Sequence, residues 1–364
     1  MVTQTGGSSQ STVASTLEAT GSSEDGVGGV YNYSGGNRVI TNYTEDETIE
    51  LDVAVTGVSV SADNFIVTSA DGTLTLNEVR GEVVSFTDSN GNIVAYSYMA
   101  NEGGTVDGRG LSVFEVIIGA NSTSNELIAS GNGSSLYGGK GEGDNTLQGG
   151  DGQDTFLYTN GSGVIRSATT GDKINFGAES YEGFRFSNDD VIISSGEGDL
   201  LVQSIRDEVI DIADGNGNVT ARVLMAGNGG DVKGDTIGGY LVMSGANEQS
   251  NIISAGNEGG SIYGGNGTYD TLIGGDGEDC FMFGYNSGFD TIYGAYSNDI
   301  INLMDVTLDN IVLSVTAGST QISLASGAQL TVDGNNGAGY LIQGKIYDAD
   351  LATNSFIERT NNNN

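Results

Sequence analysis

The sequence predicts an all-β protein in which short parallel β-solenoid blocks, of the β-roll kind, alternate with antiparallel β-hairpin segments. Three observations support this fold class. A unit of about 126 residues occurs twice in tandem. One part of each unit alternates apolar and polar residues around short Asp-Gly or Asn-Gly turns, which is typical of half-buried strands in hairpins. The other part is rich in glycine, and no segment has the periodicity of an amphipathic helix.

The tandem repeat is visible as short segments that recur in the same order. Because the matches keep nearly one offset, chance similarity between glycine-rich stretches is a poor explanation. The chain therefore holds two full units and an additional copy of the hairpin element. The recurring segments are Asp88–Asn92 with Asp214–Asn218, Leu136–Gly139 with Ile262–Gly265, Gly149–Asp154 with Gly274–Asp279, and Val67–Leu74 with Ile193–Leu200 and a third copy near Leu313–Thr320.

These two sequence patterns divide the chain into segments that follow the order of the repeat. Strand-rich segments carry the alternating pattern, and the glycine-rich blocks carry an apolar residue about every nine positions. The extra hairpin near 310–332 is a candidate cap for the stack. The predicted segments are a Ser- and Gly-rich arm at 1–42, hairpin segments at 43–125 and 177–251, β-roll blocks at 126–176 and 252–303, a C-terminal β segment at 304–360, and an unstructured tail at 361–364.

The composition excludes several classes of function. The formal net charge is -36, from 12 Lys and Arg against 48 Asp and Glu, which disfavours binding to nucleic acid or to an anionic membrane surface. The chain has no His and one Cys, so His-dependent catalysis, His-containing metal sites and disulfides within the chain are excluded. Hard cations remain as partners, because carboxylates and carbonyls are oxygen ligands.

The glycine-rich blocks contain the motif G-G-x-G-x-D-x-U-x, in which U is a large apolar residue. Residues 149–156 and 274–281 fit it without a gap, and looser copies precede them at 138–147 and 264–272. Glycine at these positions is expected to adopt positive φ and to aim carbonyl oxygens inward, while Asp adds a carboxylate suited to calcium. The candidate calcium ligands are Asp144, Gly149, Asp151, Gly152, Asp154, Asp270, Gly274, Asp276, Gly277 and Asp279.

With these motifs the sequence resembles the RTX, or haemolysin-type calcium-binding repeat, family of bacterial secreted and surface proteins. The resemblance covers 126–176 and 252–303. It includes the Asp-x-Ile continuations at Gly171–Phe176, Phe289–Ile292 and Asn298–Leu303. It implies bound Ca²⁺ and export by a type I system with an uncleaved C-terminal signal. Each block holds one clean nonapeptide where family members carry longer runs, so one or two ions per block are expected. The alternative is a glycine-rich solenoid that needs no metal.

Other residues have structural explanations. Cys280 is expected to be a half-buried strand thiol rather than a nucleophile, because no His could activate it. Tyr137 and Tyr263 are expected to pack along the coil, with a ligand-stacking platform as the alternative. The carboxylates at 45–47 and 189–190 are interpreted as turn and surface residues rather than a glycosidase pair. No catalytic residue or organic cofactor is predicted.

The function expected from these features is that of an extracellular, calcium-binding structural protein. It would self-assemble into a surface layer, filament or matrix, because unlike solenoid ends can join head to tail. The alternative is a calcium-stabilised adhesin or carbohydrate-binding module with a cell-surface or glycan partner. A fragment of a secreted enzyme is the third interpretation. No segment has the length of a transmembrane helix, and the N-terminus lacks the features of a cleaved signal peptide.

Overall fold

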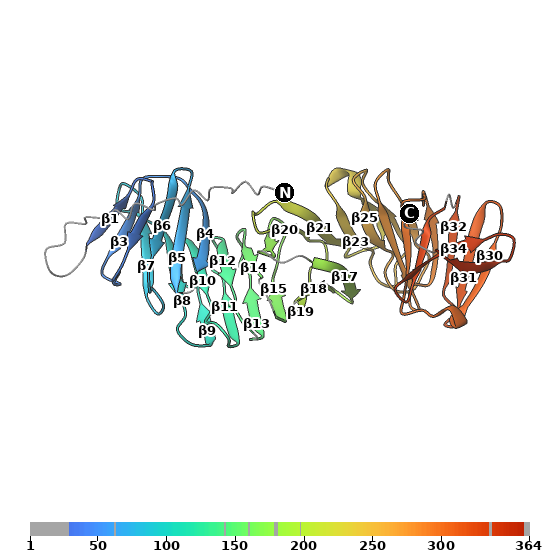
Figure 1. Cartoon of the computed structure of the whole chain (residues 1–364), viewed down its shortest axis with the longest axis horizontal. Helices are drawn as coiled ribbons and strands as arrows, with labels where there is room; N and C mark the ends of the chain where they lie inside the picture. The colour runs from blue at the N-terminus through green and yellow to red at the C-terminus, as the bar shows by residue number, and fades with distance from the viewer. Residues whose placement is uncertain are drawn as a thin grey trace, which may run out of the picture.

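The computed structural model describes residues 29–359 except 62, 142, 159–160, 178–180, 197 and 335–336. Over these residues the chain is an elongated β-solenoid (Figure 1). The described part contains no α-helix, and its two short 3-10 turns lie at Gly234–Thr236 and Leu308–Asn310. The predicted all-β solenoid is therefore confirmed. The expectations for the arm before residue 29 and for the tail at 361–364 lie outside the described residues.

One face of the solenoid is a single 17-stranded sheet that runs the length of the molecule. At about 4.8 Å between strands it extends for about 80 Å. Its strands, in spatial order, are β1 (Val30–Tyr33), β3 (Thr48–Leu51), β7 (Val83–Thr87), β8 (Ile93–Met99), β10 (Phe114–Ile118), β12 (Ser134–Tyr137), β14 (Thr155–Leu157), β16 (Lys173–Asn175), β20 (Val209–Ala213), β21 (Val219–Met225), β23 (Leu241–Ser244), β25 (Gly260–Tyr263), β27 (Asp279–Gly284), β29 (Ile300–Met304), β33 (Gly339–Ile342), β34 (Lys345–Asp350) and β35 (Ser355–Glu358).

The opposite face consists of three separate sheets. Most pairings in the two seven-stranded sheets are parallel, as expected when the chain returns to the same face once per coil, whereas the four-stranded sheet has one parallel pairing and two antiparallel ones. The sheets, in spatial order, are β2 (Arg38–Ile40), β6 (Gly72–Leu76), β5 (Asn64–Ser69) and β4 (Val55–Ser61); β9 (Gly104–Asp107), β11 (Asn125–Ile128), β13 (Asn145–Gln148), β15 (Gly163–Arg166), β19 (Gly198–Val202), β18 (Asp190–Ser195) and β17 (Tyr181–Ser187); and β22 (Gly230–Lys233), β24 (Asn251–Ser254), β26 (Thr271–Ile273), β28 (Phe289–Tyr293), β32 (Gln329–Asp333), β31 (Ser319–Leu324) and β30 (Ile311–Val315).

Each of these three sheets ends in a three-stranded antiparallel arm. The arms are β4–β5–β6, β17–β18–β19 and β30–β31–β32, and the last strand of each joins the parallel stack. The third hairpin copy was predicted near 313–320, opposite 67–74. The topology corrects this alignment by one hairpin, because the turn between β5 and β6 corresponds to the turn between β31 and β32. Local sequence similarity could not distinguish two successive hairpins of similar composition.

Two hairpins in the long sheet, β7–β8 and β20–β21, reverse the direction of the strands and divide the winding into three coil segments. Their turns are the recurring Asp-x-Asn-Gly-Asn sequences. The Asp88 carboxylate accepts hydrogen bonds from the backbone N–H groups of Asn90 and Asn92, both at 2.9 Å. Asp214 makes the same two bonds at the same distances in the second unit. The sequence repeat is therefore also a repeat of turn geometry.

The core is a stack of apolar side chains contributed by the strands of successive coils. Phe156 and Phe281, the large residues of the two clean nonapeptides, are fully buried, as are Leu147 and Leu272 of the looser copies. Each large side chain buried in this way contributes about 1.5–3 kcal/mol. Neighbouring coils complete one another's core, so a single coil could not be stable alone. The predicted inward stacking of these residues is confirmed.

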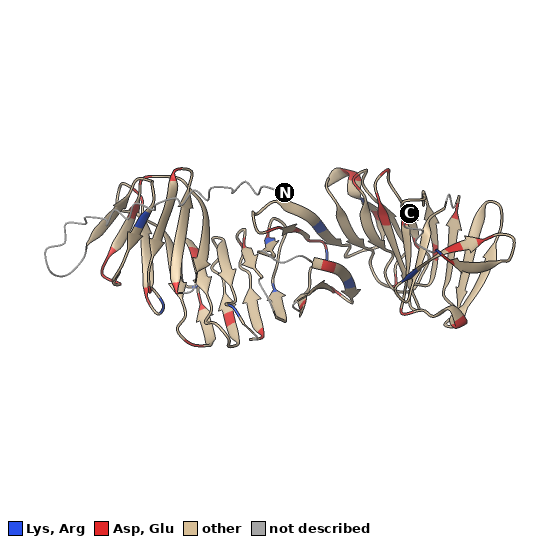
Figure 2. Ribbon diagram, viewed as in Figure 1, with Lys and Arg blue, Asp and Glu red and all other residues tan. Residues whose placement is uncertain are grey.

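An arginine follows each of the first two arms and ties that arm to the coils. The Arg80 guanidinium pairs with Asp63 at 2.5 Å and donates to the carbonyl of Ala100. Arg206 pairs with Asp189 and donates to the carbonyl of Ala226 in the same way. Otherwise acidic residues are spread along the whole rod with few basic ones among them (Figure 2).

Candidate cation sites at the turns

The aspartate of the first clean nonapeptide is inside the coil. Asp154 directly precedes β14 and is 1% exposed. Its Oδ2 accepts a hydrogen bond from the backbone N–H of Gly150 at 2.7 Å, which closes the glycine-rich turn. Its own N–H donates to Oδ1 of Asp172, which holds the same position in the next coil, at 2.8 Å. Successive coils are therefore joined at this edge by a ladder of carboxylates that cap turns.

The second repeat builds the same arrangement. Asp279, 3% exposed, accepts from the N–H of Gly275 at 2.7 Å. Its N–H donates to Oδ1 of Asp299 in the next coil at 3.0 Å. Asp299 in turn accepts from the N–H of Tyr296 at 2.6 Å. The same ladder therefore forms in both repeats.

A second ladder runs along the opposite edge, and here the two repeats differ in charge. In the first repeat it consists of Asn125 and Asn145, whose side chains are bonded at 2.8 Å. In the second repeat Asn251 is followed by two aspartates, Asp270 and Asp290, each 2% exposed. The N–H of Asp270 donates to Oδ1 of Asp290 at 3.2 Å. The second repeat therefore buries two carboxyl groups, Asp270 and Asp290, where the first repeat has the partly buried amide of Asn145 and Gly163.

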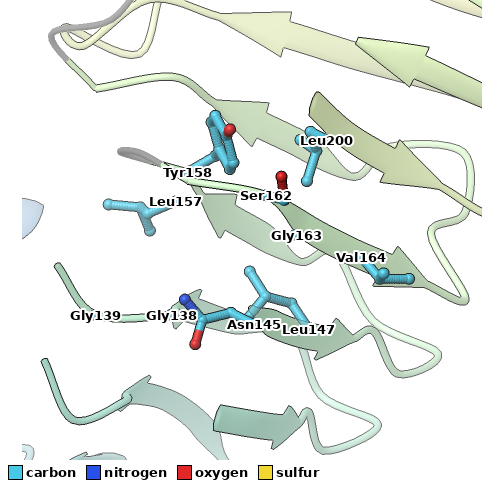
Figure 3. Close-up of a pocket in the computed structure, with 10 residues that line it drawn as sticks. All are labelled: Gly138, Gly139, Asn145, Leu147, Leu157, Tyr158, Ser162, Gly163, Val164 and Leu200. Atoms are coloured by element: carbon cyan, nitrogen blue, oxygen red, sulfur yellow. The ribbon is translucent and has the colours of Figure 1, made fainter. Parts of the chain in front are cut away.

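The first repeat ends this ladder with a glycine. Gly163 on β15 pairs with Asn145 on β13. In the second repeat Asp290 holds the position of Gly163. Figure 3 shows the small cavity left at this point, lined by Asn145, Gly163, Tyr158 and Leu200. A Cβ on Gly163 would lie 3.4 Å from its nearest neighbours, which is ordinary contact. Space for a larger side chain therefore exists in the first repeat without being used.

Several buried carboxylates retain one oxygen without a hydrogen-bond partner of normal geometry. Among the described residues these are Oδ1 of Asp154 and Asp279, Oδ2 of Asp270 and Asp290, and Oε2 of Glu115. The backbone N–H groups of Ser134 and Gly260 still lower the pKa of Asp154 and Asp279 somewhat, so these two oxygens face weak donors rather than none. Unpaired oxygens of buried carboxylates are costly unless a proton or a cation compensates them.

The pKa values reflect this cost. Burial raises the pKa of Asp154, Asp270 and Asp279 from 3.8 to about 6, against the opposing effect of the N–H donors. Burial, together with the nearby charge of Asp270, raises the pKa of Asp290 to about 8. Burial also raises the pKa of Glu115. These groups therefore bind a proton, or an equivalent positive charge, more readily than surface carboxylates do.

The candidate ligands predicted from the sequence fall into two groups in the structure. Asp154, Asp270 and Asp279 are buried in the ladders, whereas Asp144, Asp151 and Asp276 are exposed. No group of three or more Asp, Glu or Cys side chains converges on one point within the described residues. Any cation at the ladders would therefore need backbone carbonyl oxygens to complete its coordination.

The glycines of the clean nonapeptides have a different role from the one expected. The prediction of positive φ is wrong for Gly149, Gly152, Gly274 and Gly277, although it holds in the looser copies, for example at Gly139. Glycine is needed at these positions because neighbouring turns stack too closely for a Cβ atom. A Cβ at Gly152 would lie 2.1 Å from the backbone nitrogen of the previous turn, and one at Gly277 would lie 2.2 Å from the equivalent atom. At Gly149 and Gly274 it would meet carbonyl oxygens of the next turn at 2.7 and 2.5 Å.

Four acidic members of these ladders are not among the ligands predicted from the sequence. Asp172, Asp290 and Asp299 each precede a buried isoleucine strand, in the Asp-x-Ile continuations that follow the motif. That pattern was the available signal, since it places each Asp one coil after a motif aspartate. Glu115 carried no such signal. Leu241 holds the position of Glu115 in the second repeat, so the repeat does not predict a buried acid at 115.

The remaining candidates have structural roles. Cys280 is a partly buried thiol on β27, and burial raises its pKa to about 11, which disfavours a nucleophilic thiolate. Tyr137 and Tyr263 are buried along the coil as expected. Asp189 is paired with Arg206, and Asp190 accepts from the N–H of Ser204 at 2.9 Å. The adjacent acids at 189–190 are thus engaged in holding the arm.

Comparisons with known proteins place few limits on function. No protein-family profile matches the chain. No curated protein matches it by sequence. Among solved structures, the chain is similar to the extracellular lipase LipA from Serratia marcescens, with 12% identity and a TM-score of 0.31 over 80% of this chain. The chain corresponds to 43% of that lipase's length. No helix of the described residues is long and apolar enough to cross a membrane.

Proposed function

We propose that this chain is an extracellular scaffold protein of RTX type, whose coils are consolidated by calcium bound at the turn ladders. The observation that carries the proposal is the set of buried aspartates that each keep one carboxylate oxygen without a hydrogen bond of normal geometry. Asp154 and Asp279 would hold calcium at one edge, and Asp270 with Asp290 would hold it at the other. Calcium would supply the positive charge that balances these carboxylates at neutral pH.

The residues fit such an ion in their chemistry. Calcium takes six to eight oxygen ligands, and carboxylate and backbone carbonyl oxygens both serve. The stacked glycine turns bring carbonyl oxygens close to neighbouring coils, as at Ser130 beside Gly150 and Gly256 beside Gly275. The acidic surface adds a general reason for a divalent cation, because a net charge of -36 opposes compaction.

A calcium requirement would also couple folding to location. Binding energy at sites that exist only in the folded coil becomes folding energy. A chain of this kind would remain expanded at the low calcium concentration of a cytosol and would fold in a calcium-rich extracellular medium. The rod-like shape, about 80 Å along the long sheet, suits a structural role that spaces or covers a surface.

Sedimentation velocity and far-UV circular dichroism in EDTA and in 5 mM calcium test the proposal. We expect a slowly sedimenting chain with little strand signal in EDTA, and a compact β-rich species in calcium. Magnesium at the same concentration is the control for general charge screening. Identical compact, β-rich profiles under all three conditions would exclude the calcium requirement and leave a metal-independent solenoid.

Self-association into a filament or layer is a second candidate. It is favoured by the free edges of the long sheet. Among the described residues β1 pairs only with β3, and β35 pairs only with β34. Val30 on β1 is 59% exposed. Unpaired strand edges are templates for another chain. In the same sedimentation experiment, larger species that grow with protein concentration only in calcium would support assembly, and a single monomeric boundary would refute it.

A further inference from the structure

A groove of about 620 Å³ lies where the second arm meets the following coils. One wall is β17 of the arm, and the other is formed by the ends of β25, β27 and β29 and the turns after them. The arm is joined to the preceding coils by the pairing of β19 with β15, whereas among the described residues β17 pairs only with β18, so β17 faces the following coils through side chains. The volume is within the range of small-ligand sites, which often lie between structural units.

Aromatic side chains line the groove on both walls. Phe186 on β17 stacks on Tyr263 of β25, with ring centroids 6.1 Å apart and an interplanar angle of 12°. Phe184, also on β17, and Tyr285, just after β27, add two more partly buried rings. Flat apolar ring faces that stay partly open to solvent are suited to the C–H faces of sugar rings.

Amide side chains supply the polar part of the lining. Asn188, Asn266, Asn286 and Asn302 all contribute to the groove. Each amide offers two donor hydrogens and an acceptor oxygen, which suits hydroxyl groups that both donate and accept. The oxygen of Asn266 accepts a bond from the Tyr263 hydroxyl, and this contact orients its amide group. Such a lining can satisfy many hydroxyls without carrying a net charge.

The charge of the groove indicates a neutral ligand. Among the described residues that line it, Arg185 and Asp305 are the charged ones, and Arg185 is already paired with Asp199 at 2.7 Å. A chain with a net charge of -36 repels anionic ligands. A single carboxylate, without the aligned acids of the turn ladders, provides little to attract a cation. Uncharged, hydroxyl-rich ligands are the class that this lining fits best.

The first repeat shows that the fold does not require these side chains. Val58 and Val60 hold the positions of Phe184 and Phe186 in the first arm and pack against a core cluster that contains Tyr137, the residue equivalent to Tyr263. The smaller valines fill the equivalent junction of the first arm, which has the same strand topology. Phe184 and Phe186 are partly buried and pack against the core, and they give this junction a larger ring surface than the valines give the first one.

We propose that this groove is a binding site for a neutral oligosaccharide, with Phe186 as the stacking platform and the asparagine amides as hydrogen-bond partners. This site is separate from the turn ladders. It would give the scaffold a means of attachment to a polysaccharide, which goes beyond the function proposed above.

The test uses the full chain in 5 mM calcium on an array of neutral and acidic oligosaccharides, followed by calorimetry with the neutral hexasaccharides that bind. Phe186→Val places the residue of the first repeat in the second arm, and should weaken binding about tenfold. Asn286→Ala changes an exposed side chain and should weaken it about fivefold. Tyr269→Ala is the matched control, because Tyr269 belongs to a separate exposed ring pair with Phe289.

Selective binding of neutral glycans that both groove variants lose and Tyr269→Ala keeps would establish the site. Unchanged urea midpoints for the variants show that the solenoid is intact. Binding only to acidic glycans, binding that survives both groove variants, or no binding on the array would each overturn the proposal. Because the calcium proposal is measured by folding rather than by glycan binding, the two can fail separately.

Discussion

Replacement of Asp270 by asparagine separates the charge of the ladder from its hydrogen bonds. The first repeat already has Asn145 at this position. Its oxygen accepts from the backbone N–H and side-chain amide of Asn125 at 3.1 and 2.8 Å. Asp270 accepts the corresponding bonds from Asn251 at 2.7 and 2.8 Å. Asp270→Asn should therefore keep both bonds and remove one of two buried, interacting carboxylates.

The expected effect changes sign with calcium. The rise in the pKa of Asp270 from 3.8 to about 6 corresponds to about 3 kcal/mol at pH 7, and partial solvent screening reduces it to about 1–2 kcal/mol. In EDTA the variant should be more stable than the natural chain by that amount. In calcium it should be less stable, because an ion present at one hundred times its dissociation constant contributes about 2.7 kcal/mol that the variant would forgo.

Urea unfolding followed by tyrosine fluorescence measures both effects, since the chain has 16 Tyr and no Trp. Hydrogen exchange of β24, β26 and β28 then shows whether the change is local. Asp276→Asn alters an exposed carboxylate and should change stability by less than about 0.5 kcal/mol. A variant that is destabilised in EDTA, or one that retains the full calcium effect, would refute the reasoning.

The other predictions concern pH, turn stacking and the core. Because the folded-state pKa values of Asp154 and Asp279 are raised to about 6, their stabilising contribution is complete below about pH 4 and is lost as the pH rises through 6. Urea midpoints in EDTA should therefore fall between pH 4.5 and 7, and replacing both residues with asparagine should reduce the slope, with Asp270 and Asp290 accounting for part of what remains. Gly150→Ala should prevent close stacking, since its Cβ would lie 1.9 Å from the carbonyl oxygen of the neighbouring turn, whereas Gly163→Ala should stabilise by about 0.5–1 kcal/mol. Equal effects of the two alanines in thermal melts would contradict the stacking explanation. Phe281→Ala should cost about 3–5 kcal/mol in urea unfolding, and a loss below 1 kcal/mol would contradict its place in the core.

Local pattern was sufficient where each residue's environment is set by its own turn or strand. The Asp-x-Asn-Gly-Asn turns satisfy their hydrogen bonds within five residues, and both copies form as expected. The alternation in 191–193 and the apolar residue of each nonapeptide set the inward face of their strands, because a strand has a period of two. These features could be predicted because no distant contact is needed to specify them.

Contacts between coils decided what the local pattern could not. Gly152 and Gly277 are needed because the neighbouring turn lies against them, although their own φ angles suit other residues. The partners of Asp154 and Asp279 lie one coil further along the chain, so their ladders became evident only in the stacked structure. The number of residues per coil varies, so spacing in the sequence alone does not show which aspartates lie next to each other in successive coils.

The sequence by itself determined the all-β class, the tandem repeat, the positions of the turns and the inward residues of the strands. Only the tertiary structure decided which carboxylates are buried with unpaired oxygens, and that Asp270 lies beside Asp290 whereas Asn145 lies beside Gly163. It also placed the aromatic arm residue Phe186 against Tyr263, far along the chain. The physical reason is that burial and pKa depend on what the adjacent coil provides, and a repeat of about 126 residues does not specify that locally.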